Sequence, residues 1–188
     1  MSLSEIRAAI QASLAAVPNI GTIHAYERFA ARPDDLKKLY MVGDRVRGGF
    51  ITRTATRELE ASTSHNNVIH RWRINYYVGW SEQENSAAGF DYLVECMRAA
   101  FRDDETIGDV VSTTIVDGQA GLQLEDAGPV MFAGTLCHGA RFSLQTKVDE
   151  VPGVTVIDDF ATGAVRLDAI APEGSPLTDD VFQLETQE

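Results

Sequence analysis

Two histidines, His70 and His138, are the strongest candidates for chemistry in this sequence. Each falls on the apolar face of a long segment in which apolar and polar residues alternate. If the two segments form neighbouring strands, the imidazoles could act as metal ligands or as an acid–base pair near neutral pH. The alternative is two core histidines, each with one ring nitrogen bonded to the backbone. No carboxylate accompanies them at the spacing of a metal site, which favours the core interpretation.

The sequence patterns of catalytic and cofactor sites are missing from the rest of the chain. The glycine-rich stretch Gly43–Gly49 lacks the Lys and hydroxyl residues of a phosphate-binding loop, and neither GxGxxG nor GxSxG occurs. CxxC and HExxH are also missing. We therefore expect no catalytic residues, no cofactor and no metal, and predict that the protein is not an enzyme. The competing class is a small-ligand or metal-dependent enzyme that uses His70 and His138.

A group of arginines is the second candidate site. Arg71 and Arg73 alternate with apolar residues, and Arg53 and Arg57 lie in a segment expected to pair with theirs. Such a row could bind an acidic partner, or it could be a solvated sheet face, as most such rows are. Arg53, Arg71 and Arg73 are included among the predicted subunit-contact residues.

The segment from Val68 to Val116 is expected to position these groups. Its centre is a helix from Ser81 or Ser86 to Arg102, in which apolar residues recur at the steps that place side chains on one helical face. This stripe consists of Phe90, Leu93, Val94, Met97 and Phe101. The residues before it, 68–80, alternate in the manner of a half-buried strand. Residues 109–116 are rich in Val, Ile and Thr, which predicts another strand.

The flanking segments complete an expected order of elements. The expected elements are a helix at about 2–17, a strand at 22–29, a short helix at 33–41, a loop at 43–49, a strand at 50–58, a short strand near 122–124 and a long strand at 136–148. Gly128 and Pro129 are expected to break the chain before the last strand. This order predicts an α+β fold with a mixed, largely antiparallel sheet covered on one face by two main helices.

The composition divides the chain near residue 150. A length of 188 residues suits one domain with an appendage, so we expect an α+β domain at 1–150 and an acidic C-terminal extension at 151–188. Ten acids lie in residues 149–188 against the single base Arg166, and the whole chain has a net charge of −12. Residues 154–171 are expected to form a β-hairpin arm that lies on an adjacent subunit, because an isolated hairpin is marginal in water. Its predicted contact residues are Val154, Val156, Phe160, Val165, Leu167 and Ile170.

The charge and hydropathy of the chain exclude several function classes. Tight DNA binding normally needs a basic face that neutralises phosphates, and this chain is acidic. No run approaches the roughly eighteen apolar residues of a membrane helix, and no basic-then-apolar leader begins the sequence, so no membrane association is expected. Two cysteines, Cys96 and Cys137, fit a reducing compartment.

Four short stretches resemble a family of phage and prophage tail proteins. They are Asn19–Phe29, Ile51–Arg53, His70–Ile74 and Met131–His138. The stretches are scattered over residues 3–148 and are similar to the tail-terminator (tail-completion, gpU-like) group of minor tail proteins. The acidic extension after Val151 departs from the compact pattern of that family.

The resemblance implies a structural protein of the virion, assembled in the host cytoplasm. Such a subunit forms a homo-oligomeric ring, usually a hexamer, at the head-proximal end of the tail tube, where it ends tube polymerisation and docks to the neck. The implied partners are other copies of the chain, the tail tube protein and a neck or head-completion protein, with DNA only passing through the channel. Another neck connector or a baseplate subunit is the alternative within the same class.

Overall fold

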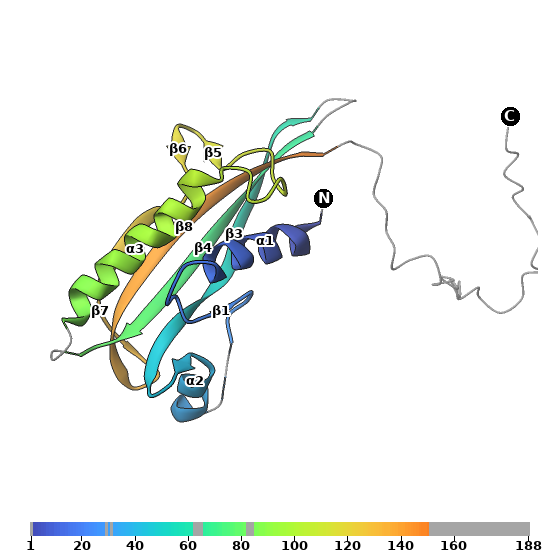
Figure 1. Cartoon of the computed structure of the whole chain (residues 1–188). Helices are drawn as coiled ribbons and strands as arrows, with labels where there is room; N and C mark the ends of the chain where they lie inside the picture. Colours follow the sequence, from blue (N-terminus) through green and yellow to red (C-terminus); the bar gives the residue numbers. More distant parts are fainter. Residues whose placement is uncertain (1, 29, 31, 62–65, 82–84, 151–188) are drawn as a thin grey trace, which may run out of the picture. The chain divides into compact units, whose positions relative to one another are not determined.

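The computed structural model describes residues 2–28, 30, 32–61, 66–81 and 85–150. In this part of the chain three helices accompany a six-stranded, mostly antiparallel sheet and a separate two-stranded hairpin (Figure 1). The predicted α+β class is therefore confirmed. The predicted C-terminal arm lies outside the described residues.

Three long antiparallel strands form the centre of the sheet. They are β3 (Arg45–Ala61), β4 (Asn66–Gly79) and β8 (Thr135–Glu150). The shorter strands are β1 (Thr22–His24), β2 (Met41–Val42), β5 (Ile115–Val116), β6 (Gln119–Ala120) and β7 (Gln123–Phe132). The sheet order is β1-β3-β4-β8-β7, with β1 parallel to β3 and β2 paired antiparallel with β3, while β5 and β6 pair with each other. β4 is thus the central strand of this order, and β7 is an edge strand.

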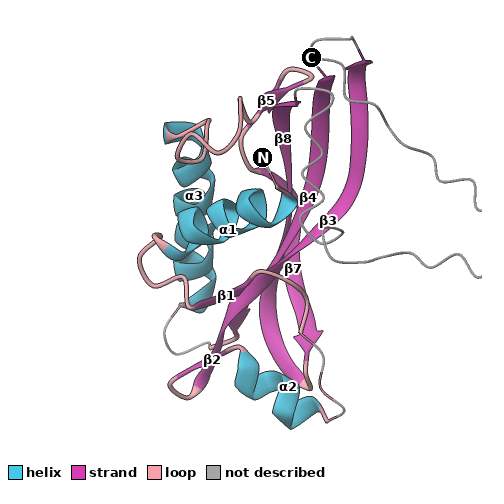
Figure 2. Cartoon of the chain, turned by 90° about the vertical axis from the view of Figure 1, so that its right-hand side faces the viewer, coloured by secondary structure: helices cyan, strands magenta, loops and turns pink. Residues whose placement is uncertain are grey.

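The helices are α1 (Leu3–Ala15), α2 (Pro33–Leu39) and α3 (Ser86–Asp103). A capping box starts α1, since the Glu5 N–H donates to Ser2 Oγ at 3.3 Å and the Ser2 N–H donates to Glu5 Oε2 at 2.7 Å. Pro33 starts α2 at a position where its missing N–H costs no hydrogen bond. α1 and α3 lie on the same face of the sheet (Figure 2), as predicted for the two main helices.

The apolar stripe of α3 packs on the central strands, as its spacing predicts. All five stripe residues are buried, and they share one core cluster with Trp72, Ile74 and Phe142 of the sheet. The buried residues of α1 join this cluster; they are Ile6, Ile10 and Leu14. The helix-facing side of β4 is therefore the floor of the main core.

The polar atoms of two buried aromatic side chains in this core are satisfied. The indole N–H of Trp72 donates to Thr146 Oγ1 at 3.0 Å, and the hydroxyl of Tyr76 donates to the Ile20 carbonyl at 2.9 Å. The Arg7 guanidinium of α1 lies 5.7 Å from the centre of the Trp72 ring. Burial raises the pKa of Tyr76 far above its ordinary value, so this phenol stays a hydrogen-bond donor.

A second, smaller core covers one end of the other face. Tyr40, just after α2, is buried with Val46, Phe50 and Cys137. Its ring lies edge-on to Phe132 at 4.9 Å between ring centres. The short helix α2 thus belongs to the face opposite to α1 and α3. Arg71 and Arg73 are exposed farther along that face, while Ile69 is buried there.

The predicted loop at 43–49 is wrong, because the strand β3 already begins at Arg45. A Cβ on Gly48 would lie 2.3 Å from the carbonyl oxygen of Thr22, and one on Gly49 would lie 2.3 Å from that of Asn75. These glycines allow the backbones of neighbouring strands to approach closely. They belong to the strand and are not loop residues.

The predicted strand at 109–116 is also wrong in most of its length. Only Ile115 and Val116 belong to a strand, and Ile107 and Asp109 have positive φ angles of 51° and 61°. The Asp104 carboxylate organises this loop by accepting the Gly108 N–H at 2.7 Å, a hydrogen bond that lowers the pKa of Asp104. The strand predicted at 22–29 is likewise shorter, because β1 ends at His24.

The break predicted at Gly128 and Pro129 does not occur, since β7 runs through both residues. Pro129 is opposite His138 of β8. Only one side of an edge strand needs paired backbone groups, so a proline is tolerated there. The short strand expected near 122–124 is therefore the start of a strand of ten residues.

Leu93→Ala tests the main core. We expect the free energy of unfolding to fall by about 2–5 kcal/mol, because the truncation leaves a cavity beneath α3. The measurement is urea denaturation followed by circular dichroism. Tyr92→Ala is the matched control, since Tyr92 of the same helix is 69% exposed and its loss should change stability by under about 0.5 kcal/mol. An equally small effect of Leu93→Ala would show that the stripe is not core.

Candidate functional site

The structure does not bring His70 and His138 together. Both lie on the helix-covered face, but His70 is opposite Thr146 whereas His138 is opposite Val78 of β4. Eight strand positions separate these registers, which corresponds to roughly 26 Å at 3.3 Å per residue. A single metal or acid–base site made of both histidines is therefore excluded by the strand register.

His138 joins the end of the sheet to the start of α3. Its Nε2 lies 2.9 Å from Ser86 Oγ, and the same hydroxyl accepts the Ser81 N–H at 2.9 Å. The imidazole stacks between Trp80 and Phe90, with ring-centre distances of 4.2 and 5.3 Å. The surroundings are those of a satisfied core histidine that positions a helix terminus.

His70 is buried at the opposite end of the same face. Its Nδ1 lies 3.0 Å from Thr56 Oγ1 of β3, and its ring is edge-on to Trp72 at 6.3 Å. Arg53 donates to the same threonine hydroxyl at 3.4 Å. These contacts tie β3 to β4 across the sheet.

The predicted arginine row is divided between the two faces of the sheet. Arg71 and Arg73 are exposed on the face opposite to α1 and α3. Arg53 is opposite Trp72 in the register and so points to the helix-covered face, as Ile51 two residues earlier does; the bulge follows, between Arg53 and Ala55. Arg57, beyond the bulge, pairs with Asp117 at 2.7 Å.

The remaining predicted contact residues lie outside the described residues. They are Val154, Val156, Phe160, Val165, Leu167 and Ile170. The structure therefore leaves the predicted arm untested.

The described residues contain no group of three or more His, Cys, Asp or Glu side chains arranged to hold a metal ion. Both cysteines are free thiols in the structure. Burial raises the pKa of the Cys137 thiol, which keeps it protonated at neutral pH. No helix of the described part of the chain is long and apolar enough to cross a membrane.

An exposed apolar surface at the β7 end of the sheet is a site that the sequence did not reveal. We call it the edge patch, and its members are Trp80, Met131 and Leu136. Val130 is also exposed, but it is opposite Cys137 and so lies on the other face of the sheet. Met131 is opposite Leu136 in the register, and the Trp80 N–H donates to the Leu136 carbonyl at 3.0 Å. Met131 is 64% exposed and the other two are 42–44% exposed. Exposed apolar side chains clustered beside an edge strand are typical of a protein-binding surface.

The available sequence signal for the edge patch was a hairpin turn. Ala133 and Gly134 join β7 to β8, and both have positive φ, at 47° and 75°. Two positive φ values are what a two-residue hairpin turn requires. Ala-Gly is a weaker signal than Asn-Gly, so it does not by itself identify the apolar residues before the turn as a strand.

His138→Phe tests the structural role of that histidine. The phenyl ring can keep the stacking on Trp80 and Phe90, but the contact with Ser86 is lost, so we expect stability to fall by about 1 kcal/mol. The oligomeric state, measured by native mass spectrometry, should not change. A changed oligomer at unchanged stability would show that His138 acts outside the core.

No protein-family model matches the chain, and no curated protein sequence matches it significantly.

Proposed function

We propose that this protein is a structural subunit of a tailed-phage particle, which forms a homo-oligomeric ring at the head-proximal end of the tail tube. The sequence resemblance supports this proposal. The structural observation that carries it is the edge strand β7 with its exposed apolar residues. A ring subunit needs such a surface for its neighbours.

The two halves of β7 differ in their chemistry. The first half has a bulge between Leu124 and Asp126, and Glu125 and Asp126 add negative charge. Bulges and charges hinder indiscriminate pairing of sheet edges, and Pro129 of the second half removes one backbone donor there, so a contact at that half relies on side chains. The second half contains two exposed apolar residues, Met131 of the edge patch and Val130 on the other face. An intersubunit contact is therefore best placed at this second half.

A closed ring also needs a second surface that differs from the first. The outer edge of β3 offers one, because β1 and β2 pair only with residues 45–46 and 48–50. Residues 51–61 of β3 have no strand on that side among the described residues. β3 and β7 run in opposite directions on opposite sides of the sheet, so joining unlike edges continues the antiparallel order.

The proposed role within the particle is to end polymerisation of the tail tube and to dock to the neck. The partners in this proposal are other copies of the chain, the tail tube protein and a neck or head-completion protein. The net charge of −12 is compatible with a channel that DNA passes through, since like charges discourage binding of phosphates.

Met131→Lys tests this proposal in the purified full-length protein. The wild type should form closed rings, seen as a single oligomer by native mass spectrometry and as rings by electron microscopy. The new charge at an apolar contact should weaken assembly at least tenfold, about 1.4 kcal/mol per contact. Its circular dichroism should remain that of the wild type, because Met131 is mostly exposed.

Ile115→Lys is the matched control for this experiment. Ile115 is 50% exposed on β5, away from the edge patch, so its substitution should leave the oligomer intact. A wild-type protein that stays monomeric up to high concentration would contradict the proposed ring. Equal loss of assembly in both variants would contradict the assignment of the contact to β7.

A further inference from the structure

Three exposed arginines form a row on the face of the sheet opposite to α1 and α3, which we call the open face (Figure 2). Arg71 and Arg73 are alternate residues of β4. Arg141 of β8 is opposite Asn75, the next β4 residue of the same face. The row therefore gives a positive surface to a protein whose net charge is −12.

The register of the strands fixes the spacing of this row. Arg71 and Arg73 are two residues apart on one strand, which corresponds to about 7 Å. Arg141 is a diagonal neighbour of Arg73 on the adjacent strand, at about 7–8 Å. Side chains on one side of an extended peptide are also about 7 Å apart. The three guanidinium groups thus match acidic side chains at alternate positions of an extended segment.

Arg141 also lines a pocket of about 250 Å³ at the end of the row. Gly128 and Gly139, which are opposite each other in the register, contribute no side chains to this space. Tyr77 and Val130 supply apolar surface, and Val130 is 37% exposed. The pocket therefore has room for an apolar side chain directly beyond the arginines.

The polar groups of this pocket suit a peptide better than a bare anion. Asp126 is opposite Arg141, and its carboxylate repels a phosphate but accepts the N–H groups of a peptide backbone. The Asn75 amide can both donate to such a backbone and accept from it. Burial and then the charge of Glu27 raise the pKa of Tyr77, while that of Arg141 lowers it, so the phenol stays protonated and can donate as well.

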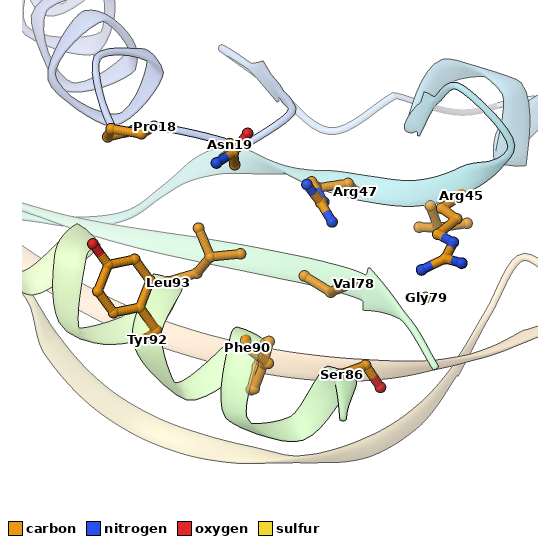
Figure 3. A pocket seen from close by; sticks show the side chains of 12 residues that line it. Pro18, Asn19, Arg45, Arg47, Val78, Gly79, Ser86, Phe90, Tyr92 and Leu93 are labelled. Atoms are coloured by element: carbon orange, nitrogen blue, oxygen red, sulfur yellow. The ribbon is translucent and has the colours of Figure 1, made fainter. Parts of the chain in front are cut away.

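The cleft beside the start of α3 is a weaker binding site for a protein segment (Figure 3). Phe90 and Leu93 in its wall are only 4% and 6% exposed, so they offer a ligand little apolar contact. The open face, in contrast, presents both its charges and its apolar pocket wall to solvent.

We infer that the open face binds an extended acidic segment of a partner protein. Carboxylates at three alternate positions of the segment pair with Arg71, Arg73 and Arg141, whose guanidinium groups allow two parallel hydrogen bonds each. An apolar residue two positions farther along enters the pocket. The inference does not depend on self-association of the chain and so goes beyond the ring proposed above.

A labelled peptide tests this inference in the purified full-length protein. The probe is fluorescein-labelled Gly-Glu-Thr-Glu-Thr-Glu-Thr-Leu-Gly, and its binding is followed by fluorescence anisotropy. We expect saturable binding, and about fivefold weaker binding or less of Gly-Thr-Glu-Glu-Glu-Thr-Thr-Leu-Gly, whose charge is equal but whose acids do not alternate. No saturable binding, or equal affinity of the two peptides, would overturn the inference.

Two further outcomes of this titration would assign the open face to another occupant. Tighter binding of single-stranded octathymidylate at the same salt concentration would assign it to nucleic acid. A probe that binds the dissociated protein but not the assembled one would assign it to a second copy of the chain. Either result would overturn the inference.

Arg73→Glu and Arg141→Glu test the row of arginines. Each should weaken binding of the probe about tenfold or more, because each removes a charge-assisted contact. Arg102→Glu is the matched control, since Arg102 is exposed on α3, on the other face of the sheet, and its substitution should change the affinity less than about twofold. Equal effects of the three variants, with unchanged circular dichroism, would contradict the assignment of the segment to this row.

Gly128→Leu tests the pocket separately. Apart from its neighbours in sequence, a Cβ on Gly128 would meet no described atom within 4 Å, so a larger side chain can enter the pocket. Binding of the probe should weaken about fivefold or more, whereas a probe with Ser in place of Leu should be unaffected. Gly89→Leu is the matched control, because Gly89 of α3 is exposed and equally open. An equal effect of Gly128→Leu on both probes, or none on either, would contradict the role of the pocket.

Discussion

The burial of the middle of β4 is the constraint on which the rest of the structure depends. Trp72 and Tyr76 are completely buried, so each must place its polar atom against a partner. Thr146 of β8 and the carbonyl of Ile20 after α1 provide these partners. β4 is paired along nearly its full length on both sides, and α1 and α3 cover it. The elements that lie far from β4 consequently expose more of their surface to solvent.

This arrangement separates a rigid centre from surfaces available to partners. The helix-covered face contains both buried histidines, which hold β3 to β4 and α3 to β8. Among the described residues, β7 and the part of β3 beyond residue 50 have no further strand on their outer sides. Since these surfaces differ from one another, they suit contacts between unlike sides of successive subunits. These surfaces support the proposed structural role in an assembly.

The strongly periodic elements were predictable from the sequence, and the edges were not. Alternation identifies which face of a strand a residue occupies, so both His70 and His138 were assigned to the buried face. It does not fix the register between strands, and the eight positions that separate them became visible only in the structure. In the sequence, Gly48 and the pair Gly128 and Pro129 indicate breaks. Close strand packing and an edge position, which are tertiary effects, make them strand residues instead.

Hydrogen–deuterium exchange of β7 tests the central claim, that subunits assemble through this edge, most directly. The backbone amides of residues 123–132 are compared in the assembled wild type and in the dissociated protein under the same conditions. The account predicts that amides of residues 130–132 exchange at least tenfold more slowly in the assembly, while those of the β5–β6 hairpin are unchanged. Equal exchange of β7 in both states would contradict it, because an edge buried between subunits cannot exchange like a free one.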